Sequence, residues 1–213
     1  MKTDRPNQYR ILIIDDNPAV HHDFRKVLAP SSNSLTEEEA ELFGDKPATS
    51  NWPVFEIDSA YQGEHGLDLI EGSLLGARPY TLAFIDVRMP PGWDGVETAS
   101  KIWKRCPDLQ IVICTAYSDY SWKDMLKLLG HSEQLFILKK PFDSIEVRQL
   151  AFAMSEQWRL GQHAKLRLSD LKELIQERTA ALKTSNAKYD LATIQLMEVL
   201  EDTRNATNRA ACG

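Results

Sequence analysis

Five short apolar runs recur along the first two thirds of the chain, and four of them contain no polar residue. They span residues 11–14, 54–57, 82–85, 111–114 and 135–138, and only the second is interrupted, by Glu56. Uninterrupted apolar runs of this length are typical of parallel strands that other elements cover on both faces. The pattern therefore predicts five short strands in a buried sheet.

Segments in which apolar residues recur at helical spacing separate these runs. They span residues 20–28, 66–75, 96–103 and 122–129, and a last one begins at Ser144. Regular alternation of strand and helix predicts an α/β fold with a doubly wound, five-stranded parallel sheet. The carboxyl ends of the strands in such a sheet form one rim, where ligands bind. The residues that follow each strand are therefore the first candidates for chemistry.

The last helical segment is unusually long, because no proline follows Ser144 and Gly161 is the only glycine before Gly213. We expect a helix of roughly 60 residues, about 90 Å long at the usual rise per residue. Eight of ten heptad seam positions in it are apolar: Leu168, Ile175, Leu182, Tyr189 and Leu196 at a, with Leu171, Arg178, Ser185, Ala192 and Val199 at d. This seam predicts a coiled coil and a homodimer.

These patterns divide the chain into an N-terminal tail (1–9), an α/β domain (10–157), a coiled-coil helix (158–209) and a short tail (210–213). The α/β domain carries an insertion at about 30–52, in which five acidic residues accompany a single lysine. Thr36 followed by three glutamates resembles a capping box, which predicts a short helix there. We interpret this insertion as a solvated surface decoration.

Composition narrows the classes of function. The net charge of −6 argues against direct nucleic-acid binding, which needs clustered basic residues. No apolar run approaches the roughly 20 residues that span a bilayer, and the N-terminus lacks a secretory signal. The cysteines, Cys106, Cys114 and Cys212, are odd in number and form no C-x-x-C pair. We therefore expect a cytoplasmic protein without membrane contact.

Residues suited to phosphoryl chemistry follow four of the five strands: Asp15, Asp16, Asp86, Thr115, Lys139 and Lys140. Carboxylates gathered at one rim repel one another unless a hard divalent cation binds there, and Mg²⁺ suits an all-oxygen site. Next to such a metal, Asp86 can attack phosphorus while a lysine and a threonine hydroxyl meet the phosphoryl oxygens.

The segments ILIIDDNP (11–18), FIDVRMP (84–90), ICTA (113–116) and LKKPF (138–142) resemble the receiver domain of bacterial response regulators. The likeness covers residues 10 to about 157. It implies that Asp16, Asp86 and the backbone carbonyl of Arg88 hold Mg²⁺, and that Asp15 acts through water.

The same resemblance implies that Asp86 is the phosphorylated residue, that the Thr115 hydroxyl acts as a switch and that Lys140 pairs with the phosphoryl group. The phosphoryl donor would be a sensor histidine kinase or a phosphotransfer protein. Such a domain promotes its own phosphorylation and dephosphorylation and is not a conventional turnover enzyme. The resemblance also implies a cis peptide bond between Lys140 and Pro141.

Four departures from the family pattern stand out. The insertion lengthens the connection before residue 54, and the loop 89–95 contains one extra residue. The doubled lysine leaves Lys139 as an alternative to Lys140, although a lysine directly before proline favours Lys140. Ile137 stands where the family usually has Tyr or Phe, and Phe136 lies one place earlier.

His21 and His22 lack partner ligands in the sequence, so we interpret them as ordinary surface or helix-face residues. Haloacid-dehalogenase-like phosphatases also phosphorylate an aspartate, but they place Asp-x-Asp after the first strand, and here the sequence is Asp-Asp-Asn. Two further functions stay open. The protein could be an interaction module that works without phosphorylation. It could also be the receiver fragment of a larger kinase or nucleotide-cyclase protein, because residues 176–182 resemble linkers in such proteins.

Overall fold

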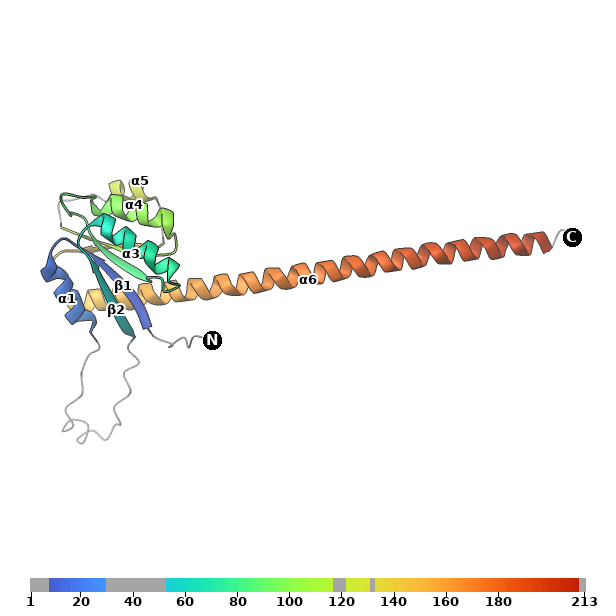
Figure 1. The fold of residues 1–213 in the computed structure, drawn as a ribbon, viewed down its shortest axis with the longest axis horizontal. Coiled ribbons are helices and arrows are strands. Elements are labelled where there is room, and N and C mark those ends of the chain that lie inside the picture. Colours follow the sequence, from blue (N-terminus) through green and yellow to red (C-terminus); the bar gives the residue numbers. More distant parts are fainter. Residues whose placement is uncertain (1–7, 30–52, 117–121, 131–132, 211–213) are drawn as a thin grey trace, which may run out of the picture. The chain divides into compact units, whose positions relative to one another are not determined.

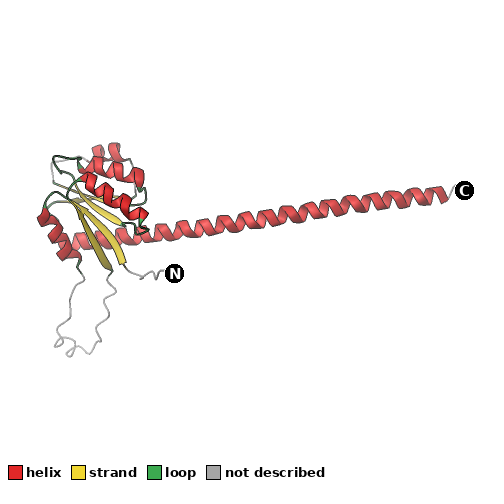
Figure 2. Ribbon diagram, viewed as in Figure 1, coloured by secondary structure: helices red, strands yellow, loops and turns green. Residues whose placement is uncertain are grey.

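The computed structural model describes residues 8–29, 53–116, 122–130 and 133–210. Within these residues, strands and helices alternate along the chain (Figures 1 and 2). The elements are β1 (Gln8–Ile14), α1 (Pro18–Leu28), β2 (Val54–Ala60), α3 (Gly63–Leu75), β3 (Leu82–Asp86), α4 (Gly95–Arg105), β4 (Gln110–Thr115), α5 (Trp122–Leu129), β5 (Leu135–Lys139) and α6 (Ser144–Ala210). Two features of the sequence lie outside the described residues: Cys212 and the short helix predicted near Thr36.

The five strands form one all-parallel sheet in the order β2-β1-β3-β4-β5. This is the doubly wound sheet that the alternating pattern predicts, and the order reverses direction between β1 and β3. Side chains alternate between its two faces, so each strand contributes to two cores. Leu12 and Ile85 pack with α3, α4 and α5 on one face, whereas Ile13 and Phe84 pack with α1 and the start of α6 on the other.

The strands extend beyond the apolar runs that predict them, because the hydrogen-bonded ladder continues into polar residues at their ends. Two strands are each longer than predicted by three residues: β2 ends at Ala60, and β1 begins at Gln8, inside the expected tail of residues 1–9. Tyr9 is buried, its ring lies 6.1 Å from that of Phe55, and its hydroxyl donates a hydrogen bond to Glu156 in α6. Burial and this hydrogen bond together raise the pKa of Tyr9 to about 12.

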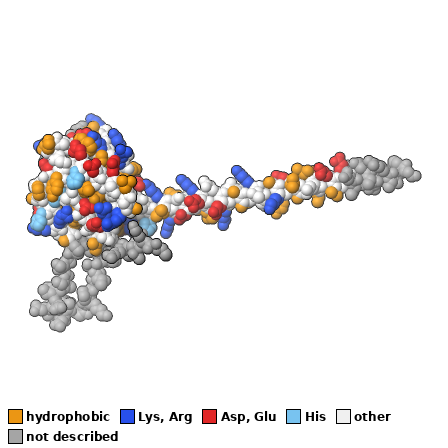
Figure 3. Space-filling view, in the orientation of Figure 1, with side chains coloured by type: hydrophobic (Ala, Val, Ile, Leu, Met, Phe, Trp, Pro, Cys, Tyr) orange, Lys and Arg blue, Asp and Glu red, His pale blue; other side chains and the backbone are white. Residues whose placement is uncertain are grey.

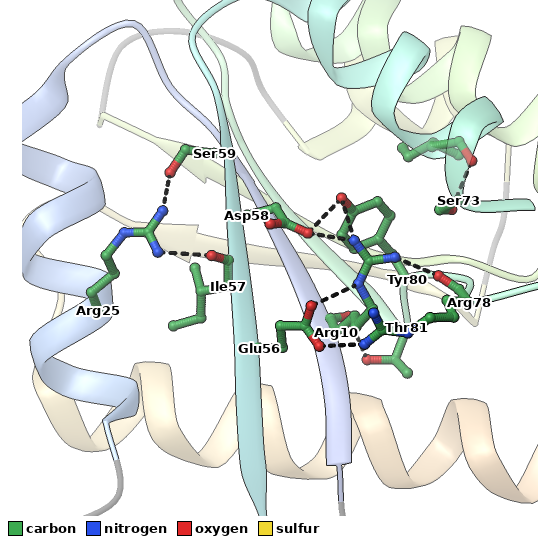
Figure 4. Close-up of polar contacts among 11 residues, drawn as sticks. Arg10, Arg25, Glu56, Ile57, Asp58, Ser59, Ser73, Arg78, Tyr80 and Thr81 are labelled. Carbon is green, nitrogen blue, oxygen red and sulfur yellow. Dashed lines mark hydrogen bonds and ion pairs between the residues drawn. The ribbon is translucent and has the colours of Figure 1, made fainter. Parts of the chain in front are cut away.

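A polar network joins the edge strand β2 to β1 and to the residues before β3 (Figure 4). Arg10 in β1 donates to Asp58 in β2 over 2.5 Å, and the Tyr80 hydroxyl donates to the same carboxylate over 2.7 Å. The Arg10 guanidinium also lies 4.2 Å from the centre of the Tyr80 ring. Arg78 pairs with Glu56 over 2.6 Å. These contacts bind the edge of the sheet to its centre.

Local capping residues fix where two of the helices, α1 and α4, begin. The Asn17 side chain accepts a hydrogen bond from the Ala19 amide over 3.0 Å, and Pro18 occupies the first turn of α1. Pro fits that position because its missing N–H has no partner to lose in the first turn. Asp94 caps α4 by accepting from the Glu97 amide over 2.7 Å. Both helices therefore start directly after the loops that carry the strand-end residues.

The chain divides into two compact units, Met1–Gly161 and Gln162–Gly213. The first unit contains the sheet and the first turns of α6, whose Val147, Ala151 and Met154 are buried. In the second unit the apolar seam residues of α6 are exposed, and they alternate with charged side chains along the helix (Figure 3). Within the described residues, no helix has a segment long and apolar enough to cross a membrane.

Candidate functional site

The carboxyl ends of β1, β3 and β5 bring three distant parts of the chain to one rim. Asp15 follows β1, Asp86 is the last residue of β3 and Lys140 follows β5. The register explains the convergence, because Ile14 lies opposite Ile85 in the neighbouring strand, and Thr115 lies opposite Lys139. Parallel strands in register end together, so the residues that follow them are neighbours.

Lys140 connects the two inner carboxylates of this rim. Its Nζ lies 2.9 Å from Asp15 Oδ2 and 2.6 Å from Asp86 Oδ1. The preceding residue, Lys139, is exposed, because consecutive side chains at a strand end point in opposite directions. Of the two candidate lysines, Lys140 is therefore the one that faces the carboxylates. The Lys140–Pro141 bond is cis, in agreement with the resemblance, and Pro90–Pro91 is also cis.

Three carboxylates gather around this lysine. Asp15 is buried, Asp86 is half-buried and Asp16 is exposed, yet one oxygen atom from each lies within 4.8 Å of the other two. Lys140 neutralises only one of the three negative charges. The remaining excess of negative charge and the all-oxygen donor set fit a hard divalent cation such as Mg²⁺.

Backbone N–H groups occupy the other carboxylate oxygens of the two inner aspartates. The Arg88 amide donates to Asp86 Oδ2 over 3.1 Å, and the Asn17 amide donates to Asp15 Oδ1 over 2.9 Å. Gly95 packs against the backbone of Asp86 and Val87 so closely that a Cβ atom on Gly95 would lie 2.2 Å from the Asp86 carbonyl oxygen. The backbone that follows each aspartate therefore holds its carboxylate in place.

The surroundings shift two pKa values at the site. Burial raises the pKa of Asp86 and outweighs the opposing effect of its hydrogen bond and ion pair with Lys140, while Asp15 adds to the increase. For Lys140, burial is the largest single influence and lowers the pKa. Its hydrogen bonds and ion pairs with Asp86 and Asp15 together outweigh burial, so the pKa of Lys140 is raised. Lys140 is therefore held in its charged form.

Thr115, the residue expected to act as the switch, is buried at the end of β4, and Cys114 beside it lies opposite Asp86. Its hydroxyl donates to the Ala116 carbonyl over 2.9 Å. Neither Ile137 nor Phe136 changes the expectation that the aromatic position implied by the resemblance is absent at residue 137. Ile137 packs against the core below α3, α4 and α5, whereas Phe136 packs on the opposite face of the sheet.

His21 corrects the sequence interpretation, because it is a buried residue and not a surface one. Its ring nitrogen Nε2 lies 2.7 Å from the Asp15 carbonyl oxygen, and its ring centre lies 4.6 Å from that of Tyr61. The available signal was its spacing, since His21 precedes the buried Phe24 and Leu28 by three and seven residues on the core face of α1. His22 is exposed.

No protein-family model matches this chain, and no curated protein matches it significantly. Solved structures do resemble it. A CheY-like response regulator receiver domain protein from Methanospirillum hungatei is 19% identical with a TM-score of 0.51, over 72% of this chain and 98% of that one. A structure described as adenylate cyclase from Rhodopirellula baltica is 20% identical with a TM-score of 0.55, over 76% and 98%.

The signal receiver domain of an HD domain-containing protein from Pseudomonas fluorescens has a TM-score of 0.53 at 15% identity, over 76% of this chain and 97% of that one. At such identities the likeness establishes the fold alone. The chain has the flavodoxin-like receiver fold of response regulators, and a long C-terminal helix follows it.

Proposed function

We propose that this protein is a phosphoacceptor of a two-component phosphorelay. Asp86 accepts a phosphoryl group from a sensor histidine kinase or a phosphotransfer protein, and the C-terminal helix passes the signal on. One observation supports this most directly: Lys140 Nζ lies within 3 Å of carboxylate oxygens of both Asp15 and Asp86, and Asp16 lies beside them. Acidic metal ligands, a nucleophilic carboxylate and a cation are the groups that such a transfer needs.

In the proposed reaction, a carboxylate oxygen of Asp86 forms a bond to phosphorus as the bond from phosphorus to the donor's nitrogen breaks. Asp16, Asp86 and the Arg88 carbonyl would hold Mg²⁺ directly, and Asp15 would hold it through water. When bound, the cation would neutralise charge on the phosphoryl oxygens. Lys140 exchanges its contact with the Asp86 carboxylate for one with a phosphoryl oxygen, and the Thr115 hydroxyl turns from the Ala116 carbonyl to donate to another.

The exposed apolar seam of α6 supports homodimerisation as the route of output. Leu168, Leu171, Ile175, Leu182 and Val199 are each more than half exposed within the described chain. A second copy of the helix would cover them in a coiled coil. Location in the cytoplasm is part of this proposal, since the proposed kinase partners act there.

Phosphorylation with a small phosphodonor tests the assignment. Intact-mass and peptide mass spectrometry should detect one phosphoryl group after incubation with acetyl phosphate and Mg²⁺, and Asp86→Asn should abolish it. Asp68→Asn, an exposed aspartate of α3, is the matched control and should be phosphorylated normally. A phosphoryl group elsewhere would refute the assignment, and none at all would favour an interaction module that does not need phosphorylation.

The role of Asp16 is tested separately through the metal. Asp16→Ala should weaken Mg²⁺ binding and slow phosphorylation, because the incoming phosphoryl group would meet uncompensated carboxylates. Asp23→Ala, at an exposed position of α1, should leave both unchanged. Equal Mg²⁺ affinity in Asp16→Ala and wild type would contradict a direct metal ligand.

A second candidate is that this chain is the receiver segment of a larger kinase or nucleotide-cyclase protein. The similarity to a structure described as adenylate cyclase favours it, because the match covers 98% of that chain and 76% of this one. Sequencing the gene beyond the codon for Gly213 distinguishes the two, since a downstream catalytic domain would make this chain a segment of the larger protein.

A further inference from the structure

Among the groups near the rim that the proposed mechanism does not use, His21 is the most constrained. It is a buried residue of α1, and its Nε2 atom lies 2.7 Å from the carbonyl oxygen of Asp15. A carbonyl oxygen only accepts, so Nε2 carries the proton and donates this hydrogen bond. His21 therefore holds the backbone, not a side chain, of the turn that contains Asp15 and Asp16.

Other contacts fix the ring so that it can hold that carbonyl. Tyr61, just after β2, lies against the His21 ring with centres 4.6 Å apart and an angle of 53° between the planes. The Asp15 amide donates to the Ala60 carbonyl over 3.2 Å, which ties the same turn to the end of β2. The Asp15 backbone is therefore held at both its N–H and its carbonyl, once by the neighbouring strand and once by His21.

The Asp15 carbonyl belongs to the peptide group that joins Asp15 to Asp16. Fixing its oxygen fixes the plane of that peptide and so the position of the Asp16 Cα atom. The Asn17 amide donates to Asp15 Oδ1 and holds the next peptide, and the two peptides together set the direction in which the Asp16 side chain leaves the backbone. Asp16 depends on this, because its exposed carboxylate has no hydrogen-bond partner among the residues that the structure describes. By contrast, Lys140 and the Asn17 amide hold the Asp15 carboxylate directly.

We infer that His21 is a positioning residue for the metal site: its Nε2–H orients the Asp15–Asp16 peptide so that the Asp16 carboxylate meets Asp86 at the cation. The inference rests on the proposed Mg²⁺ site and adds a residue to it. Partners that orient metal ligands typically contribute 10- to 100-fold to metal affinity, and a hydrogen bond to the ligands' own backbone acts in the same way.

Two conservative variants separate positioning from packing. In His21→Gln the side-chain amide nitrogen reaches about as far from Cα as Nε2 does, so it can still donate to the Asp15 carbonyl. In His21→Asn the amide nitrogen reaches only as far as Nδ1, so that hydrogen bond is lost although the residue stays polar. His21→Leu keeps volume and removes the donor. Leu28→Ala removes buried volume two turns along the same helix and is the control for general destabilisation.

Isothermal titration of each full-length variant with Mg²⁺ alone measures the effect. We expect Mg²⁺ affinity to fall about tenfold or more in His21→Leu and His21→Asn, and to stay within a few-fold of wild type in His21→Gln and Leu28→Ala. In wild-type protein, nitrogen-15 spectra of the imidazole should show a protonated Nε2, and its proton should be protected from exchange.

Wild-type Mg²⁺ affinity in His21→Leu would overturn the inference, and so would equal affinities in the Gln and Asn variants. Wild-type protein that binds Mg²⁺ without phosphorylation of Asp86 would refute the proposed function, but the role of His21 would stand. Wild-type protein that binds no Mg²⁺ would overturn both.

Discussion

The ammonium nitrogen of Lys140 lies 2.6 Å from Oδ1 of Asp86, although the two residues are 54 positions apart in the chain. The same nitrogen contacts Asp15 Oδ2 at 2.9 Å. One ammonium group thus separates two carboxylates that would otherwise repel each other in a partly buried setting.

Replacing Lys140 with Met should destabilise the metal-free protein by about 1.5–3 kcal/mol, because two carboxylates lose a charged hydrogen-bond partner. Added Mg²⁺ should restore part of the loss, since a bound cation replaces the missing charge. Thermal unfolding with and without Mg²⁺ measures both effects. Lys139→Met is the matched control and should change neither, and equal effects of the two substitutions would reassign the lysine.

Gly95→Ala should disturb Asp86 through the backbone. A Cβ atom at this position would lie 2.2 Å from the Asp86 carbonyl oxygen, so β3 or α4 must shift and the phosphorylation rate should fall. Gly72→Ala is the control, because nothing lies within 4 Å of a Cβ added there and alanine favours the helix by about 0.5–1 kcal/mol. Denaturant unfolding should show that Gly95→Ala is less stable than wild type and that Gly72→Ala is not, and only Gly95→Ala should be phosphorylated more slowly. A Gly95→Ala variant that matches wild type would contradict the packing.

The contribution of Asp58 to stability should depend on pH. Burial acts to raise the pKa of Asp58, but hydrogen bonds from Tyr80 and Arg10 together outweigh it and lower that pKa below its ordinary value of 3.8. A carboxyl with a lowered folded-state pKa stabilises the protein above its unfolded pKa and loses this effect as pH falls through the folded pKa.

Asp58→Asn should therefore be less stable than wild type at neutral pH, and the difference should shrink as pH falls below about 4. Denaturant unfolding of both proteins between neutral pH and pH 3 measures it. Asp68→Asn, at an exposed position, should show little difference at any pH. A difference that grows on acidification would contradict the lowered pKa.

The seam of α6 should determine the oligomeric state. Ile175→Asp combined with Leu182→Asp removes two apolar a positions, each worth about 1.5–3 kcal/mol when buried, and sets carboxylates opposite each other in a dimer. Sedimentation equilibrium should show a monomer, and Asp86 should still be phosphorylated.

The control for the seam is Ala180→Asp with Ala187→Asp, which changes helix propensity and charge at exposed positions outside the seam. It should stay dimeric. A seam mutant that remains dimeric would move the interface to the receiver unit, and a monomeric wild type would point to a different partner helix.

Local pattern alone determined the number, order and type of the main elements. Four of the five strands contain an uninterrupted apolar run, such as residues 82–85, and burial on both faces of a sheet imposes that pattern directly. The aspartates and the lysine after such runs also predicted the rim, because parallel strand ends converge. The apolar pattern did not predict strand residues that are polar, so it missed the start of β1 at Gln8.

Tertiary structure decided which atoms meet. The sequence already favoured Lys140 over Lys139, but its contacts with Asp15 and Asp86 follow from the direction in which its side chain leaves the backbone after β5. The role of His21 follows from a hydrogen bond to a backbone carbonyl, a group that every residue possesses. Residue type does not encode such contacts. They depend on strand register and on backbone direction, which form only when segments far apart in the chain pack together.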